Sequence, residues 1–191
     1  RNCGNPISAR YPAVELGTGV LFAMFAAHFG VHAVLPAYLY LAAVGISLAM
    51  IDIDLLKLPD ALTYPSYPVG LALFAIPAFV DHLGHDYVRA LIGMAALGLF
   101  YGIVWFIYPS GMGLGDVKLL AMIAAFLGFA PSILALFFGV VMASAYAAFL
   151  LARGRANALS KLPFGSFLAV GGWIAALYAD RLIDLYANLL R

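Results

Sequence analysis

The stretch Gly111–Lys118, with the sequence GMGLGDVK, is the most informative segment of this chain. It places three glycines and one carboxylate, that of Asp116, between two strongly apolar segments. Glycine adopts backbone conformations closed to other residues and lets a second chain approach closely. Asp116 falls where an apolar run, Val117–Phe129, begins, so its carboxylate is positioned to cap a helix or to lie beside its free N–H groups. In a soluble protein this pattern is usually a glycine turn with an acidic cap.

The composition changes that interpretation. Of the 191 residues, 65% are hydrophobic and 10% are charged, and the mean hydropathy is +1.02. A chain this apolar cannot bury its side chains in a water-soluble core, so we predict an all-α, polytopic transmembrane bundle. Beside a bilayer, an ionisable residue such as Asp116 becomes a functional candidate. The net charge of +1, without a basic patch interleaved with aromatics, predicts no nucleic-acid partner.

The apolar runs predict about seven spans. The second run has fifteen residues, or about 22 Å of helix, against a hydrocarbon core of about 30 Å. Either Asp52, which follows it, is recessed into the membrane or the bilayer thins there. The third run contains three prolines and should be kinked. The predicted spans are Val14–Val34, Ala37–Ile51, Ala61–Val80, Tyr87–Tyr108, Val117–Phe129, Ser132–Ala152 and Phe164–Leu189.

Lysine and arginine predict the orientation, because cytoplasmic loops carry an excess of both. With the N-terminus inside, seven cations face the cytoplasm and three face outward. All four histidines then lie at or near outer loops, where we interpret them as solvated residues and not as a metal site. The inner cations are Arg1, Arg10, Lys57, Lys118, Arg153, Arg155 and Lys161, the outer ones are Arg89, Arg181 and Arg191, and the histidines are His28, His32, His82 and His85.

This topology brings two carboxylates to one face. Asp52 leaves the second predicted span and Asp116 enters the fifth, both at the cytoplasmic side. Two carboxylates that share a site cannot both ionise cheaply, so one can serve as base and the other as acid toward a water between them. A helix N-terminus favours an anion and a C-terminus disfavours it, so we expect Asp116 to be the more acidic partner.

Three blocks of sequence resemble the type IV prepilin leader peptidases, membrane aspartic proteases of the GxGD group. Gly113–Asp116 is a GxGD motif, and Asp52, with the Leu58–Pro65 block LPDALTYP, is similar to the first aspartate block of that family. The opening segment Arg1–Glu15 resembles the segment after the family's four-cysteine zinc module. The resemblance implies that residues 1–12 are a remnant of a zinc and methyltransferase module, and that residues 13–191 form the transmembrane aspartic peptidase domain.

The resemblance also implies an activity. Asp52 and Asp116 would be the catalytic pair, in the bacterial inner membrane with the active site facing the cytoplasm. The reaction would be cleavage of a short basic leader after a glycine, ahead of the hydrophobic helix of a prepilin or a type II secretion pseudopilin. Membrane lipid is the other expected partner; neither the particular pilin nor the oligomeric state follows from the sequence.

The remaining candidate residues surround this pair. We expect Gly111, Gly113 and Gly115 to let the substrate backbone approach closely, although a plain reversing turn is equally compatible. Asp54 cannot share the helical face of its neighbour Asp52, and it could attract a cationic leader. Asp60 is expected to cap the third span.

Cofactors are expected only for a longer form of the protein. Many family members also methylate the new N-terminus with S-adenosylmethionine and hold zinc through two CxxC pairs. Cys3 is the single cysteine here and a remnant zinc ligand, and one thiolate cannot build a tetrahedral zinc site. We therefore expect no zinc in this chain and no cofactor for proteolysis.

Lys118 is expected to extend toward lipid phosphates, and Glu15 to cap the first span at the interface.

Two other classes of protein fit part of the pattern. Paired intramembrane carboxylates and proline-broken helices also occur in proton-coupled transporters. A transporter should show inverted repeats and charges at the membrane midplane, whereas we find no convincing repeat and both aspartates lie at one face. A noncatalytic assembly factor of a secretion machine is the third class; both candidate catalytic residues are nevertheless intact.

Overall fold

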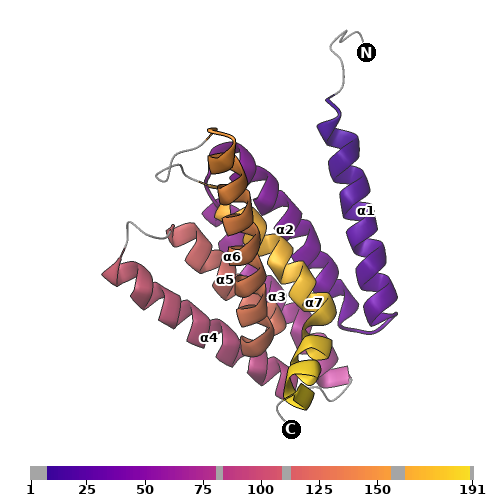
Figure 1. Cartoon of the computed structure of the whole chain (residues 1–191). Coiled ribbons are helices and arrows are strands. Elements are labelled where there is room, and N and C mark those ends of the chain that lie inside the picture. The colour runs from indigo at the N-terminus through magenta and orange to yellow at the C-terminus, as the bar shows by residue number, and fades with distance from the viewer. Residues whose placement is uncertain (1–7, 81–83, 109–112, 156–161, 190–191) are drawn as a thin grey trace.

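The computed structural model describes residues 8–80, 84–108, 113–155 and 162–189, and this part of the chain is a bundle of helices without strands. The first residues of α1 and the last residues of α7 lie at opposite ends of the bundle (Figure 1). The predicted all-α architecture is confirmed. The helices are α1 (Arg10–Phe29), α2 (Leu35–Leu55), α3 (Asp60–Val80), α4 (Gly84–Ile107), α5 (Leu114–Leu127), α6 (Phe129–Ala152) and α7 (Phe164–Leu189).

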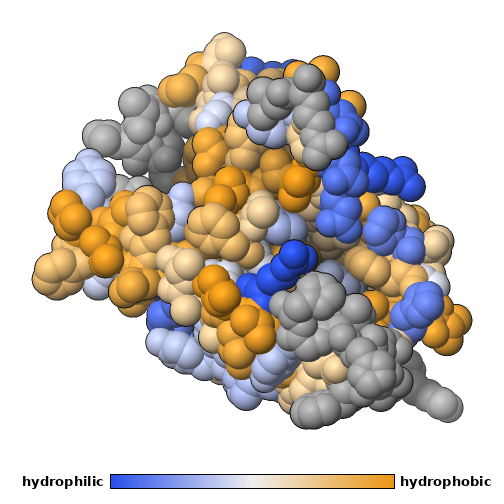
Figure 2. Space-filling model, turned by 90° about the horizontal axis from the view of Figure 1, so that it is seen from below, coloured by the Kyte–Doolittle hydropathy of each residue, from blue (hydrophilic) through white to orange (hydrophobic). Residues whose placement is uncertain are grey.

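Five of these helices are long and apolar enough to cross a membrane: α1, α2, α4, α6 and α7. The other two are α5, which has 14 residues, and α3, which contains three prolines. Viewed from below, hydrophobic residues cover much of the molecular surface and hydrophilic residues gather in a few places (Figure 2). Such an exterior fits a bilayer and not water.

Several predicted helix ends were wrong. α1 begins at Arg10, before the predicted start at Val14, and ends at Phe29 and not at Val34, because Gly30 adopts a φ of 63°. α2 continues past Asp52 to Leu55, where Leu56 enters the left-handed region with a φ of 51°. Its 21 residues reach about 31 Å, enough for a hydrocarbon core, and Asp52 then lies within the helix and not after its end.

The boundary between α5 and α6 also differs from the prediction. α5 begins at Leu114, three residues earlier than expected, and its C-cap is Gly128, whose φ of 77° favours glycine. α6 starts at the next residue, Phe129, so the two helices are joined by a single residue. The chain therefore turns at Gly128 and not between the predicted spans Val117–Phe129 and Ser132–Ala152.

α3 runs continuously through its three prolines. A proline frees the carbonyl one turn earlier, and hydroxyl side chains commonly bond to carbonyls of this region in membrane helices. The Ser66 Oγ donates to the Leu62 carbonyl at 2.6 Å and lies 3.1 Å from the Tyr40 hydroxyl of α2. The contact with Tyr40 attaches this part of α3 to α2.

The core is centred on α5. Nine of its 14 residues are buried, and it packs against α2, α3, α4, α6 and α7. A helix that is apolar on all sides is stable only when it is surrounded. Asp116, in the first turn of α5, is therefore held at one end of the best enclosed element of the bundle.

Candidate active site

Asp52 lies in the last turns of α2 and is only 5% exposed. Its Oδ2 atom accepts a hydrogen bond of 2.9 Å from the backbone N–H of Ser166, and the Ser166 Oγ lies 3.2 Å from the same oxygen. Ser166 is the third residue of α7, and the first N–H groups of a helix have no acceptor within it. The start of α7 thus supplies donors to a carboxylate from α2.

Asp116 is the third residue of α5, counted from its N-cap Gly113. The backbone of Gly113 hydrogen-bonds to its carboxylate, which is half of the reciprocal arrangement known as a capping box. α5 is outside the five candidate spans. Burial, followed by the negative charge of Asp52, raises the pKa of Asp116 to about 7. The two carboxylates are therefore close enough for the charge of one to act on the other.

This result reverses one expectation. The N-terminus of α5 was expected to make Asp116 the more acidic partner, but burial outweighs the helix end and raises its pKa to about 7, so the protonated form is well populated at neutral pH. Asp116 accepts a backbone hydrogen bond from Gly113, whereas Asp52 accepts both the backbone N–H of Ser166 at 2.9 Å and its hydroxyl at 3.2 Å, and an ionised carboxylate is the better acceptor. On these contacts we assign Asp52 as the ionised member of the pair and Asp116 as the protonated one.

Leu58, from the α2–α3 connection, joins the two halves of the site. A Cβ added to Gly115 would lie 3.0 Å from the Leu58 Cβ, and one added to Gly165 would lie 2.9 Å from its Cδ1 and 3.1 Å from the Asp52 Oδ2. Close packing against Leu58 therefore explains Gly115. Gly113 is exposed, and its predicted contact with substrate stays a prediction; Gly111 lies outside the described residues.

Sequence reasoning missed the contribution of α7. Gly165 and Ser166 were assigned only to the start of an apolar span. A glycine followed by serine at a helix N-terminus could have signalled free N–H groups and a close approach. Nothing in the spacing indicated that the acceptor would be a carboxylate 114 residues away.

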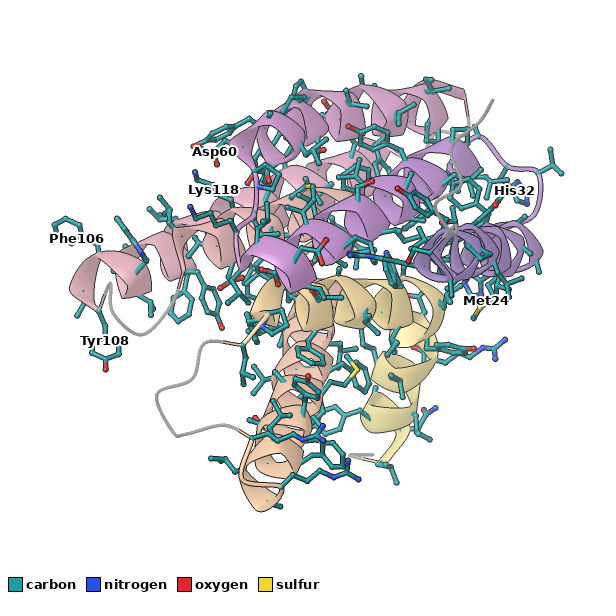
Figure 3. All side chains as sticks on the ribbon, turned by 90° about the horizontal axis from the view of Figure 1, so that it is seen from above. Met24, His32, Asp60, Phe106, Tyr108 and Lys118 are labelled. Atoms are coloured by element: carbon teal, nitrogen blue, oxygen red, sulfur yellow. The ribbon has the colours of Figure 1, made fainter. Side chains whose placement is uncertain are left out.

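Two other predicted site residues form ion pairs instead. The Asp54 Oδ2 lies 2.7 Å from Nη2 of Arg10 in α1, so this carboxylate already has a cationic partner within the chain. The Lys118 Nζ lies 2.7 Å from the Asp60 Oδ1 and 4.8 Å from the centre of the Tyr64 ring. Figure 3 shows Asp60 and Lys118 directed toward each other from α3 and α5. Lys118 thus binds α5 to α3, which corrects the expectation that it reaches for lipid.

An apolar cavity of about 560 Å³ lies beside the site, between α1, α2 and α7. Ser166 lines it, as do Trp173 of α7, Ile53 of α2 and Met24 of α1. In the described residues no group of three or more His, Cys, Asp or Glu side chains could hold a metal ion. These residues therefore do not fit a zinc site, and Cys3 lies outside them.

The helical membrane bundle and the pair of interacting carboxylates are typical of a membrane aspartic peptidase. The chain belongs to the type IV leader peptidase family, whose sequence profile matches residues 39–148. That range contains both Asp52 and Asp116. A comparison with solved structures gave no match.

Curated relatives agree with this assignment. The chain is 34% identical over 190 residues to a prepilin leader peptidase/N-methyltransferase of Stutzerimonas stutzeri, covering 99% of this chain and 65% of that protein. It is 37% identical to the protein of that name from Aeromonas hydrophila, covering 97% and 64%. It is 33% identical to the prepilin leader peptidase/N-methyltransferase of Bacillus subtilis, and the match covers 99% of this chain and 74% of that protein. The chain thus spans slightly less than two thirds of the first two relatives.

Proposed function

We propose that this chain is an aspartic endopeptidase that cleaves the leader of type IV prepilins or related pseudopilins, with Asp52 and Asp116 as its catalytic pair. The observation that carries the proposal is the electrostatic interaction between these two carboxylates, which come from α2 and α5. The family assignment and the names of the relatives support the substrate class. They favour a peptidase over the proton-coupled transporter.

The chemistry follows from the different environments of the two carboxyl groups. Ionised Asp52 takes a proton from a water molecule while the water oxygen attacks the scissile carbonyl carbon. Protonated Asp116 gives its proton to the carbonyl oxygen, which completes a neutral tetrahedral intermediate. When the C–N bond breaks, the proton held by Asp52 passes to the leaving amine and a hydroxyl proton returns to Asp116. Both carboxyl groups then regain their starting states.

The test is cleavage of a synthetic prepilin in lipid, followed by mass spectrometry of the new N-terminus. We expect Asp52→Asn and Asp116→Asn each to lower cleavage by at least a thousandfold with folding unchanged, because each removes one proton-transfer partner. Asp54→Asn is the matched control and should retain most activity, since Asp54 pairs with Arg10. Substantial activity in Asp52→Asn or in Asp116→Asn would contradict the assignment of these two residues as the catalytic pair. If neither this chain nor a form extended to the relatives' length cleaved the prepilin, the proposed peptidase activity would be contradicted.

We further propose that the site faces the cytoplasm, on the strength of the lysine and arginine distribution. In a Cys3→Ser background, an impermeant thiol reagent applied to spheroplasts should label Val31→Cys, between α1 and α2. It should not label Lys57→Cys, between α2 and α3. Both positions are exposed and lie at opposite ends of α2. The reverse pattern would place the carboxylates on the wrong side for a cytoplasmic leader.

Methyl transfer is not part of this proposal. The relatives carry N-methyltransferase in their name, and we expect S-adenosylmethionine and zinc to bind only a form that reaches the length of those relatives. The carboxylate pair supports cleavage, which requires neither.

A further inference from the structure

Ser166 makes three contacts where α7 meets α2, and it is 7% exposed. Its backbone N–H donates to the Asp52 Oδ2 at 2.9 Å. Its Oγ lies 3.2 Å from the same oxygen and 2.9 Å from the Ala49 carbonyl oxygen, one turn earlier in α2. The hydroxyl therefore lies between a carboxylate and a carbonyl of one helix while belonging to another.

A serine hydroxyl has one proton to donate and lone pairs with which to accept. When Asp52 is ionised, the Ser166 hydroxyl can donate to Oδ2 beside the backbone N–H. When Asp52 carries a proton on Oδ2, that proton can be donated to the Ser166 Oγ, whose own proton then goes to the Ala49 carbonyl. The Asp52 Oδ2 and the Ser166 Oγ are thus hydrogen-bonded to each other in both protonation states without movement of the backbone.

The backbone around Ser166 is built for this close approach. A side chain at Gly165 would crowd the Asp52 Oδ2, because an added Cβ would lie 3.1 Å from it. Both contacts with Ser166 use Oδ2, so this oxygen is the one whose protonation the Ser166 hydroxyl can follow.

We propose that Ser166 is a positioning residue for Asp52: its N–H fixes Oδ2, and its hydroxyl changes from donor to acceptor as Asp52 takes up a proton. This inference rests on the proposed peptidase function, in which Asp52 gains and loses a proton in every turnover. Ser166 touches neither the substrate nor the water, and acts through Asp52.

The first test is the pH profile of prepilin cleavage by the full chain and by Ser166→Ala. A hydrogen bond to a charged group is worth roughly a tenfold to hundredfold change in an equilibrium. We expect kcat to fall by about that factor with KM nearly unchanged, and the acid limb of the profile to move to higher pH, because the Asp52 anion loses a donor. An unchanged kcat and profile in the folded variant would overturn the proposal.

Ser132→Ala is the matched control. Ser132 is also a buried serine, and its hydroxyl donates to the Gly128 carbonyl at 2.7 Å, away from Asp52. It should keep the parent profile. Ser166→Thr retains the hydroxyl and should restore the position of the acid limb; a folded threonine variant with the alanine profile would contradict the proposal. If Ser166→Ala does not fold, Ser166→Cys keeps the size with a weak donor, and the same shift is expected.

A second readout does not depend on cleavage. Infrared difference spectra recorded across a pH titration report the carboxyl band of Asp52, identified by its loss in Asp52→Asn. Ser166→Ala should change the frequency and the midpoint of that band, and Ser132→Ala should change neither. A changed band in a chain that cleaves no prepilin would keep Ser166 as the partner of Asp52 and overturn the peptidase instead. An unchanged band would overturn the role of Ser166 alone.

Discussion

The helices α5 and α1 differ in almost every respect. Nine of 14 residues are buried in α5, but only Leu21 and Phe25 are buried among the 20 residues of α1. α5 packs against five other helices, whereas α1 packs mainly on α2 and stands at the side of the bundle (Figure 1). α5 is surrounded by the rest of the bundle, whereas α1 lies against one side of the bundle.

This difference shows how the fold holds an acidic group. A carboxylate whose pKa is raised to about 7 needs a partly dry environment with little freedom to relax. α5 provides it for Asp116 because its body is enclosed. The charged residue at the start of α1, Arg10, is exposed and forms an exposed ion pair with Asp54. The same kind of substitution should therefore have a larger effect at α5 or its direct contacts than at α1 or its direct contacts.

The largest effect on the free energy of unfolding should come from replacing a tightly packed glycine with alanine. A Cβ at Gly93 of α4 would lie 2.6 Å from the backbone of Gly128 and Phe129, at the α5–α6 junction. Gly93→Ala should lower the free energy of unfolding by about 3 kcal/mol. Gly17→Ala in α1, where nothing lies within 4 Å, should raise it by up to about 1 kcal/mol. Thermal unfolding in detergent measures both; equal effects would remove the contrast.

A medium effect is expected from shortening a methionine. Met122 of α5 is 0% exposed and Met24 of α1 is 41% exposed; Figure 3 marks Met24 on α1. Met122→Ala should cost about 2 kcal/mol through lost packing, and Met24→Ala about 0.5 kcal/mol or less. Denaturant titration of the two variants in the same detergent gives the difference. A larger loss for Met24 would mean that α1 is held more firmly than its burial indicates.

The smallest effect should come from neutralising one acid of each ion pair. Both pairs have an N–O distance of 2.7 Å, but the Lys118 side chain is 17% exposed and that of Arg10 is 44% exposed. Asp60→Asn should lower the free energy of unfolding by about 1 kcal/mol, because the largely covered side chain of Lys118 loses its partner. Asp54→Asn should have a smaller effect on the free energy of unfolding, because exposed ion pairs contribute little. Added salt should reduce the difference, and a larger loss for Asp54→Asn would contradict this ranking.

Much of the architecture could be predicted from composition and apolar runs. The helical bundle and the approximate position of each helix followed from hydropathy, because a membrane-spanning helix needs a long apolar run. Helix ends were less predictable. α2 passes through Asp52 and ends at Leu55. The next residue, Leu56, has a positive φ, which leucine rarely adopts, so no local signal marked the end of the helix.

The site could be predicted only in part. The motif around Asp116 and the position of Asp52 indicated a pair, but their relative acidity depended on burial, which the sequence does not display. The contacts of Ser166 with Asp52 and of Lys118 with Asp60 join residues far apart in the chain. Such contacts arise from helix packing, and single-sequence patterns report local periodicity.

The single-residue junction at Gly128 has a consequence for synthesis of the protein. α5 has 14 residues, about 21 Å of helix, which is too short to cross a hydrocarbon core by itself. α6 has 24 residues and is long enough to do so. We therefore expect the two to enter the bilayer together as a helical hairpin, with α6 drawing α5 in during translation. The helix that carries Asp116 would thus reach its place only after the chain beyond it has emerged from the ribosome.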